Sequence, residues 1–106
     1  MDPLMVNSTL AELNLSGNIL DNEFAVDLSY VLENNETLFK VDISKNPIGP
    51  EGARYLLNTL LQTNDTLGSL GELSENVYMG VRVREELNQA LRLNNESHDK
   101  KKVYLA

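Results

Sequence analysis

The chain of 106 residues contains no cysteine and only one histidine, His98. Without cysteine it can form no disulfide, no thiolate metal site and no cysteine nucleophile. The lack of cysteine also fits a reducing compartment, and we expect a cytoplasmic protein. His98 has no nucleophile placed near it and no second histidine to share a metal, so it predicts neither a catalytic base nor a zinc site.

Long apolar runs and positive charge are also scarce. No stretch of eighteen apolar residues is present, and residues 1–4 lack the basic flank and apolar core of a signal peptide. The chain has 9 Lys and Arg against 16 Asp and Glu, which gives a net charge of −7. Because an acidic domain repels phosphate backbones, the sequence predicts no nucleic-acid partner, and it predicts no membrane partner either.

Three segments of the chain repeat one pattern, L-x-x-L-x-L-x-x-N, with valine or isoleucine replacing some leucines. The copies begin at Leu10, Leu38 and Leu67, so the period is 28 and then 29 residues. Each copy ends in an asparagine, whose amide can bond the backbone where the chain turns; these are Asn18, Asn46 and Asn76. The third copy is one residue longer, and we expect a bulge near Gly71 to absorb the extra residue.

The apolar residues alternate within a copy, which is typical of a short strand with one buried face. We expect the first strand near residues 11–15, with Leu13 and Leu15 pointing inward, and equivalent strands in the other copies. The polar residues between them should face away from the core and form one net-acidic strip that contacts a partner. The members of this strand-face strip are Glu12, Asn14, Ser16, Lys40, Asp42, Ser44, Glu72 and Ser74. Phe39 is the nearest apolar candidate beside it, since interface hot spots favour aromatic residues.

A stretch with apolar residues at helical spacing follows each predicted strand. Pro50 and Glu51 suit the first turn of the second helix. We expect helices near residues 22–34, 50–63 and 81–94, with Asn95 in the third repeat taking the place of Asn64 in the second. This alternation predicts an α/β fold in one domain, residues 1–96, with repeats near 9–36, 37–65 and 66–96. Residues 97–106, which include Lys100 to Lys102, should form a charged C-terminal tail.

Two segments resemble a known family. Residues 46–53 (N-P-I-G-P-E-G-A) and 64–67 (N-D-T-L) are similar to ribonuclease-inhibitor-type leucine-rich repeats, and the resemblance covers about residues 7–96. It implies a right-handed solenoid with a short parallel sheet on its concave side and helices on its convex side. Similar repeats occur in the actin-capping tropomodulins and leiomodins, in the GTPase-activating protein for Ran and in innate immune sensors. The resemblance therefore implies a fold more specifically than a role.

The remaining polar clusters do not predict chemistry. Asp42, Ser44 and Asn46 resemble the start of a calcium loop, but Pro47 stands where that loop requires glycine. Carboxylates are plentiful, yet three short repeats form a shallow arc and no pocket that could shift their pKa values. We therefore predict no catalytic, cofactor-binding or metal-binding residue, and no enzyme.

The function predicted from the sequence is protein–protein interaction through the concave strand face, with a partner that the sequence does not identify. One alternative is a cytoskeletal regulator, because the third repeat is similar in layout to the C-terminal repeat of tropomodulins. Another is a regulator of a GTPase or of another enzyme.

The N-terminal end of the array has no polar cap in the sequence. Residues 4–10 look like the tail of a preceding repeat whose helix is absent, so the first strand should be an uncovered edge. Two interpretations stay open: the chain is a piece of a longer array, or a partner or a second copy of the chain covers this edge by self-association.

Overall fold

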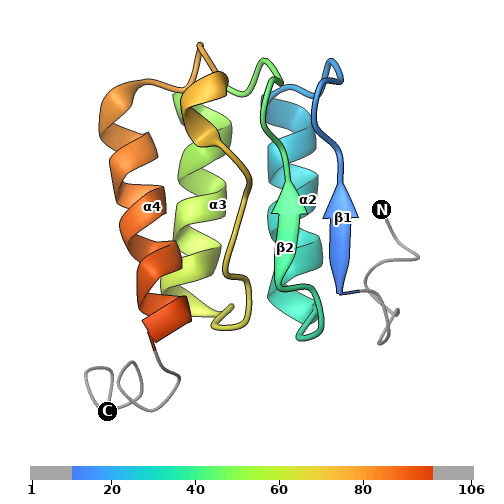
Figure 1. Cartoon of the computed structure of the whole chain (residues 1–106), viewed down its shortest axis with the longest axis vertical. Coiled ribbons are helices and arrows are strands. Elements are labelled where there is room, and N and C mark those ends of the chain that lie inside the picture. The colour runs from blue at the N-terminus through green and yellow to red at the C-terminus, as the bar shows by residue number, and fades with distance from the viewer. Residues whose placement is uncertain (1–10, 97–106) are drawn as a thin grey trace.

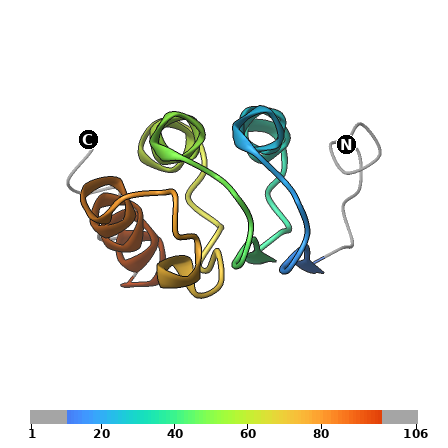
Figure 2. The ribbon, with the colours of Figure 1, turned by 90° about the horizontal axis from the view of Figure 1, so that it is seen from above.

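Strands and helices alternate along the chain in the computed structural model, which describes residues 11–96. Figure 1 shows the helices side by side behind the strands, and Figure 2 shows the helix layer and the strand layer from above. The predicted tail at 97–106, with His98 and the lysine cluster, and the predicted repeat remnant at 4–10 lie outside the described residues. The elements are β1 (Glu12–Asn14), α2 (Asn22–Asn34), β2 (Lys40–Asp42), α3 (Pro50–Gln62), the 3-10 helix η1 (Leu73–Glu75) and α4 (Val81–Glu96).

The helices begin where the sequence predicts and end within two residues of the predicted positions. Helix α2 spans the expected range, α3 ends one residue earlier, and α4 runs two residues further. The Asp21 carboxylate caps α2 by accepting a hydrogen bond of 3.2 Å from the backbone N–H of Phe24. Pro50 lies at the start of α3, where a backbone N–H would have no acceptor within the helix. The missing N–H of proline therefore costs no hydrogen bond.

The two strands pair in parallel, with Leu13 opposite Val41. Backbone hydrogen bonds extend the pairing beyond both strand ends, from Phe39 N to Ala11 O (2.9 Å) and from Leu15 N to Asp42 O (2.8 Å). Each strand has only three residues because each sequence copy contains a single apolar alternation before the chain turns toward its helix.

The core lies between the strand layer and the helix layer. Leucine and alanine side chains on the inner faces of the helices meet the inward residues of the strands, and burial of one leucine contributes about 2 kcal/mol. The largest fully buried side chains are Leu28, Leu32, Leu38, Ile43, Ile48, Leu56, Leu60, Leu67, Leu70, Leu73, Met79 and Leu87.

Asn18 and Asn46 bond the backbone where the chain turns, as the sequence predicts, and Asn46 and Asn76 also join one repeat to the next. The Asn46 amide nitrogen donates to the carbonyl oxygens of Leu15 and Ile43, both at 3.0 Å, and its Oδ1 accepts from the N–H of Leu20 at 3.1 Å. The N–H of Asn46 in turn donates to Oδ1 of Asn76 at 2.8 Å. We call Asn18, Asn46 and Asn76 the asparagine ladder.

A second set of asparagines joins the helix ends. The Asn64 amide donates to Leu32 O at 2.8 Å, and the Asn94 amide donates to Leu67 O at 2.8 Å. Asn94 therefore takes the place of Asn64, and the prediction that Asn95 does so is wrong. Helix α4 continues past this point and places Asn94 on its buried face, whereas Asn95 is exposed and donates to Gly68 O at 2.8 Å.

The third repeat does not form the predicted strand. It pairs with β2 through a single bridge between Lys40 and Ser69 and then turns into η1. Leu70 and Leu73 are three residues apart, so a continuous strand would point them to opposite faces. Both are nevertheless buried, with 0% and 1% exposure, because the chain turns between them. The irregularity begins at Gly71 (φ +84°), where the sequence places it, but the result is a 3-10 turn and not a bulge.

Candidate protein-binding face

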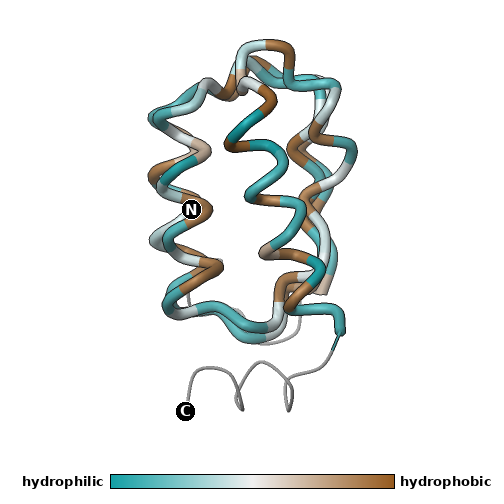
Figure 3. The backbone as a smooth tube through the Cα atoms, turned by 90° about the vertical axis from the view of Figure 1, so that its left-hand side faces the viewer, coloured by the Kyte–Doolittle hydropathy of each residue, from teal (hydrophilic) through white to brown (hydrophobic). Residues whose placement is uncertain are grey.

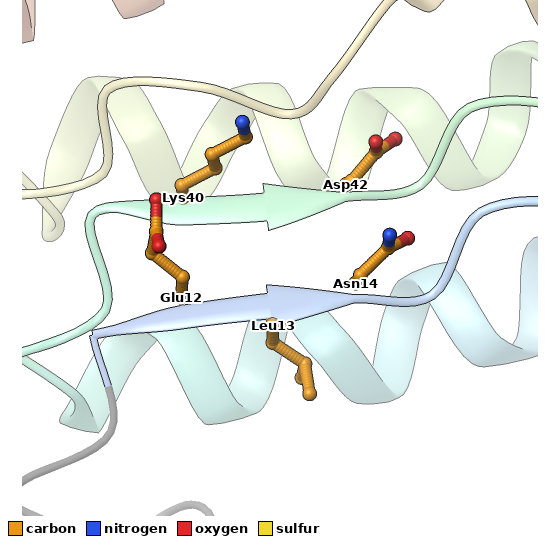
Figure 4. A pocket seen from close by; sticks show the side chains of 5 residues that line it. All are labelled: Glu12, Leu13, Asn14, Lys40 and Asp42. Carbon is orange, nitrogen blue, oxygen red and sulfur yellow. The ribbon is translucent and has the colours of Figure 1, made fainter.

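Four members of the strand-face strip lie together on β1 and β2. The strand register pairs Glu12 with Lys40 and Asn14 with Asp42. Figure 4 shows these four side chains projecting from the same side of the two strands, while Leu13 points away from them. The alternation of the first two copies therefore predicts the direction of these side chains correctly.

The four side chains surround a shallow hollow of about 280 Å³, and Leu13, which lies between Glu12 and Asn14 in the chain, also contributes to its lining. Glu12 and Lys40 are exposed and Asp42 is half-buried, and none of the three forms an ion pair within the described part of the chain. A positive charge thus lies between two negative ones on an open surface. Such a pattern can set the orientation of a polar partner, because its charges are not already paired within the protein.

Two serines of the strip, Ser16 and Ser44, form hydrogen bonds that close the turns at the strand ends. Oδ1 of Asn14 accepts hydrogen bonds from the N–H and hydroxyl of Ser16, at 3.0 and 2.7 Å. Oδ1 of Asp42 accepts the equivalent bonds from Ser44, at 3.0 and 2.6 Å. These contacts close a turn at each strand end, as Asn and Asp side chains do when a serine follows two residues later.

Ser44 is only 4% exposed, so the prediction that it faces a partner is wrong. Its hydroxyl is bonded to the Asp42 carboxylate, and Ser16, which makes the equivalent bond to Asn14, is half-buried. The N-x-S and D-x-S spacing in the first two copies contains the signal for this turn.

The same contacts fix the charge of Asp42. The Ser44 hydroxyl that donates to the Asp42 carboxylate lowers its pKa below the ordinary value, although partial burial acts in the opposite direction. The Ser44 backbone N–H and the positive charges of Lys40 and Lys45 add to the lowering of the pKa. Asp42 is therefore ionised at neutral pH, and the face keeps a fixed negative charge at that strand end.

Glu72 and Ser74 do not continue the strip along a third strand. Both are exposed, but they lie at η1, where the Ser74 hydroxyl donates to the Glu72 carboxylate at 2.9 Å. Their predicted place on a strand is wrong for the reason given above, the three-residue spacing of the inward leucines. Phe39, the predicted apolar neighbour, is 50% exposed next to β2.

Sequence reasoning did not identify a second hollow, on the helix side between α2 and α3. It measures about 270 Å³, and its lining includes the exposed aromatic side chains of Tyr30 and Tyr55. These tyrosines occupy positions off the apolar stripe of each helix, which is the signal that could have indicated an exposed aromatic pair.

Neither a metal centre nor a membrane span is found in the part of the chain that the structure describes. Between residues 11 and 96, no three His, Cys, Asp or Glu side chains gather closely enough to hold a metal ion. None of the described helices is long and apolar enough to cross a bilayer.

Known proteins show the same repeat architecture. The family model described as "Leucine Rich repeat" matches residues 34–57. Tonsoku-like protein of Bos taurus is 40% identical over 70 residues, which are 66% of this chain and 5% of the length of that protein. The solved structure of Leiomodin-1 Actin-Binding Site 2 has a TM-score of 0.68 at 19% identity, and the match covers 97% of this chain and 74% of that one. The second likeness is one of fold. With three copies of the pattern in the sequence and alternating strands and helices in the structure, the chain is a leucine-rich repeat protein.

Proposed function

We propose that this chain is a protein-binding module and not an enzyme, and that it binds its partner through the strand face. The observation that carries the proposal is the group formed by Glu12, Asn14, Lys40 and Asp42. Their side chains project together from two paired strands and surround an open hollow. Polar side chains held on a rigid sheet fix the orientation of a partner at little cost in conformational entropy.

We propose further that the repeats form a right-handed solenoid of the ribonuclease-inhibitor type, with the strand face on its concave side. Parallel strand–helix–strand connections are right-handed in nearly all proteins. Neighbouring strands lie about 4.8 Å apart and packed helices about 8–10 Å apart. A stack built from both layers therefore bends toward its strands, which would bring Lys40 and its neighbours around a convex partner surface.

The test reverses the charge pattern without changing the net charge. In the double variant Glu12→Lys/Lys40→Glu, two exposed side chains exchange their charges. The matched control, Glu33→Lys/Arg54→Glu, makes the same exchange between exposed residues of α2 and α3. Both variants and the wild type would be immobilised, and proteins retained from a cell lysate would be identified by mass spectrometry after circular dichroism has shown equal folding.

We expect a partner that the wild type and the control retain and that the strand-face variant loses, with an affinity at least about tenfold weaker, or about 1.4 kcal/mol. A partner retained equally by all three proteins would place the binding site elsewhere and overturn the proposal. Loss in the control alone would move the site to the helix side.

A second candidate is actin regulation. The fold resembles that of Leiomodin-1 Actin-Binding Site 2, a segment named for its binding of actin. Sedimentation with filamentous actin tests this candidate: co-sedimentation that the strand-face variant abolishes would support it, and a chain that stays in the supernatant would exclude it. Regulation of a GTPase or another enzyme stays a prediction from the sequence, as do the cytoplasmic location, self-association at the N-terminal end and the lack of a nucleic-acid or membrane partner.

A further inference from the structure

An apolar row lies on the edge of the molecule where the chain passes from the strand layer to the helix layer. The residue after each asparagine of the ladder is apolar: Ile19 is 91% exposed, Pro47 is half-buried and Val77 is 80% exposed. The ladder bonds from Leu20 N to Asn46 and from Asn46 N to Asn76 hold successive repeats in register, so these three positions follow one another. Figure 2 shows the three connecting loops side by side at this edge.

The row widens over the third repeat. Tyr78 is 67% exposed and Val81 is 57% exposed, and both follow Val77 closely along the chain. Gly80 lies beside Pro50, since a Cβ added to it would lie 3.9 Å from Cγ of Pro50. The third loop therefore adjoins the start of α3, and Figure 3 shows the apolar colouring at this end of the molecule. We call Ile19, Pro47, Val77, Tyr78 and Val81 the apolar edge.

The core does not explain these exposed side chains. The loops already contribute Ile48 and Met79 to the interior, both with 0% exposure, so the apolar edge is additional to what packing requires. Exposed apolar residues are ordinary when scattered, but a contiguous group with polar surroundings marks an interaction surface.

The charges beside the apolar edge are mostly negative. Asp21 and Glu23 are exposed at the start of α2, and Glu51 is exposed at the start of α3. Among the nearby basic residues, Lys45 is already paired with Glu75, with 3.8 Å between Nζ and Oε2. Arg82 and Arg84, both in the first turn of α4, are the positive charges beside Val81, and Arg84 is half-buried. A ligand that reaches from the third repeat to the first therefore meets apolar surface and then carboxylates.

We propose that the apolar edge docks a basic amphipathic segment of a partner protein. Its apolar side chains pack against Val77, Tyr78 and Val81, and its lysines or arginines face the carboxylates of the first two repeats. Anionic lipid and nucleic acid have the wrong charge for this surface, and so does a second copy of a chain with net charge −7. The proposal concerns a different surface from the strand face and does not depend on it.

The probe is a synthetic 16-residue peptide of leucine and lysine, with the leucines on one helical face, and a second peptide has glutamate in place of lysine. Binding would be measured by fluorescence anisotropy. We expect the lysine peptide to bind the wild type and the glutamate peptide to bind at least about tenfold more weakly, because the edge carboxylates repel it. The decisive variant is Val77→Ser/Tyr78→Ser, which removes apolar surface without changing charge, and we expect about tenfold weaker binding.

Three further double variants separate the contributions of charge, of apolar surface elsewhere and of the strand face. Glu23→Lys/Glu51→Lys should also weaken binding of the lysine peptide and should reduce its dependence on salt. Tyr30→Ser/Tyr55→Ser removes two exposed aromatic residues from the helix side and should leave the affinity unchanged, as should Glu12→Lys/Lys40→Glu on the strand face.

The proposal is overturned if the lysine peptide does not bind, or if Val77→Ser/Tyr78→Ser binds it as tightly as the wild type does. Analytical ultracentrifugation of the free proteins distinguishes a second copy as the occupant. A wild-type dimer that this variant converts to a monomer would show that the edge joins two chains, and it would also overturn the proposal.

Discussion

The second and third repeats contain the same kinds of residues in the same order, yet only the second repeat forms a strand. In the second repeat, Val41 and Ile43 are two residues apart, and β2 runs straight between its neighbours. In the third, Leu70 and Leu73 are three residues apart, and the chain leaves the sheet after a single bridge. All four side chains are nonetheless buried.

The hydrogen bonds show where the two repeats diverge. Val41 N donates to Ser69 O and Ile43 N donates to Leu70 O, both at 3.0 Å. The two donors are two residues apart, whereas their acceptors are adjacent residues. The regular spacing of hydrogen bonds between parallel strands is therefore lost at this point. Burial of the leucines therefore takes precedence over continuation of the strand, because apolar burial is the larger contribution to stability.

Loss of an asparagine that follows the strand segment of a repeat should destabilise the second repeat more than the third. The buried side chain of Asn46 is the hydrogen-bond partner of Leu20 N, Leu15 O and Ile43 O, so Asn46→Ala should lower the free energy of unfolding by about 3 kcal/mol. Asn76→Ala should cost about 1 kcal/mol, because Oδ1 of Asn76 accepts from Asn46 N while its buried Nδ2 has no hydrogen-bond partner in the described structure. Urea unfolding of both variants measures the difference, and equal losses would contradict it.

The next effect concerns the glycine at which the third repeat turns. Gly71 has a φ of +84°, and a Cβ there would overlap the Asp42 carboxylate. Gly71→Ala should therefore lower the free energy of unfolding by about 2–3 kcal/mol, from backbone strain and overlap together. The matched control is Gly17→Ala, where φ is +71° and nothing lies within 4 Å, so strain alone should cost about 1 kcal/mol. Thermal or urea unfolding that gave the same loss for both would show that the overlap relaxes without cost.

A deletion should convert the third repeat into a copy of the second. Removal of Gly71 restores L-x-x-L-x-L-x-x-N, which places Leu70 and Leu73 on the same face of a strand. We expect η1 to be replaced by a third strand paired with β2, and amide hydrogen exchange at Leu73 to slow by about tenfold. Unchanged exchange, or loss of the folded state, would show that the leucine spacing is not what breaks the strand.

The smallest effect concerns the turn that ends β2, which uses Asp42 and Ser44. Ser44→Ala removes the main cause of the lowered Asp42 pKa, so this pKa should rise toward its ordinary value. Because the folded-state pKa of Asp42 is lowered, its contribution to stability is present above the unfolded pKa and is lost as pH falls through the folded pKa. The variant should thus lose less stability than the wild type when the solution is acidified below about pH 4. Carboxyl NMR titration of Asp42 measures the pKa, and an unchanged value would contradict the assigned cause.

The sequence predicted most of the fold because period and composition report burial directly. The inward direction of Leu13 and Val41 follows from apolar spacing, and the helix starts at 22, 50 and 81 follow from apolar spacing together with Pro50 and Glu51 in the first turn of the second helix. The third strand was predicted from its likeness to the other copies, although its own leucine spacing indicates a turn. At the candidate site, alternation gave the direction of Glu12, Asn14, Lys40 and Asp42. Alternation did not give the burial of Ser44, because the signal for the turn in which its hydroxyl bonds Asp42 is the D-x-S spacing and not the apolar pattern.

The turn at η1 also has a consequence for how the molecule behaves at high concentration. An open sheet edge offers free N–H and C=O groups to strands of other molecules, and such edges promote aggregation. At η1 the N–H groups of Glu75 and Asn76 donate to Glu72 O and Leu73 O instead, both at 3.1 Å. Because these two N–H groups are bonded within the chain, η1 does not offer them to an incoming strand. We expect the deletion of Gly71 that extends the sheet to make the protein more prone to aggregate as well.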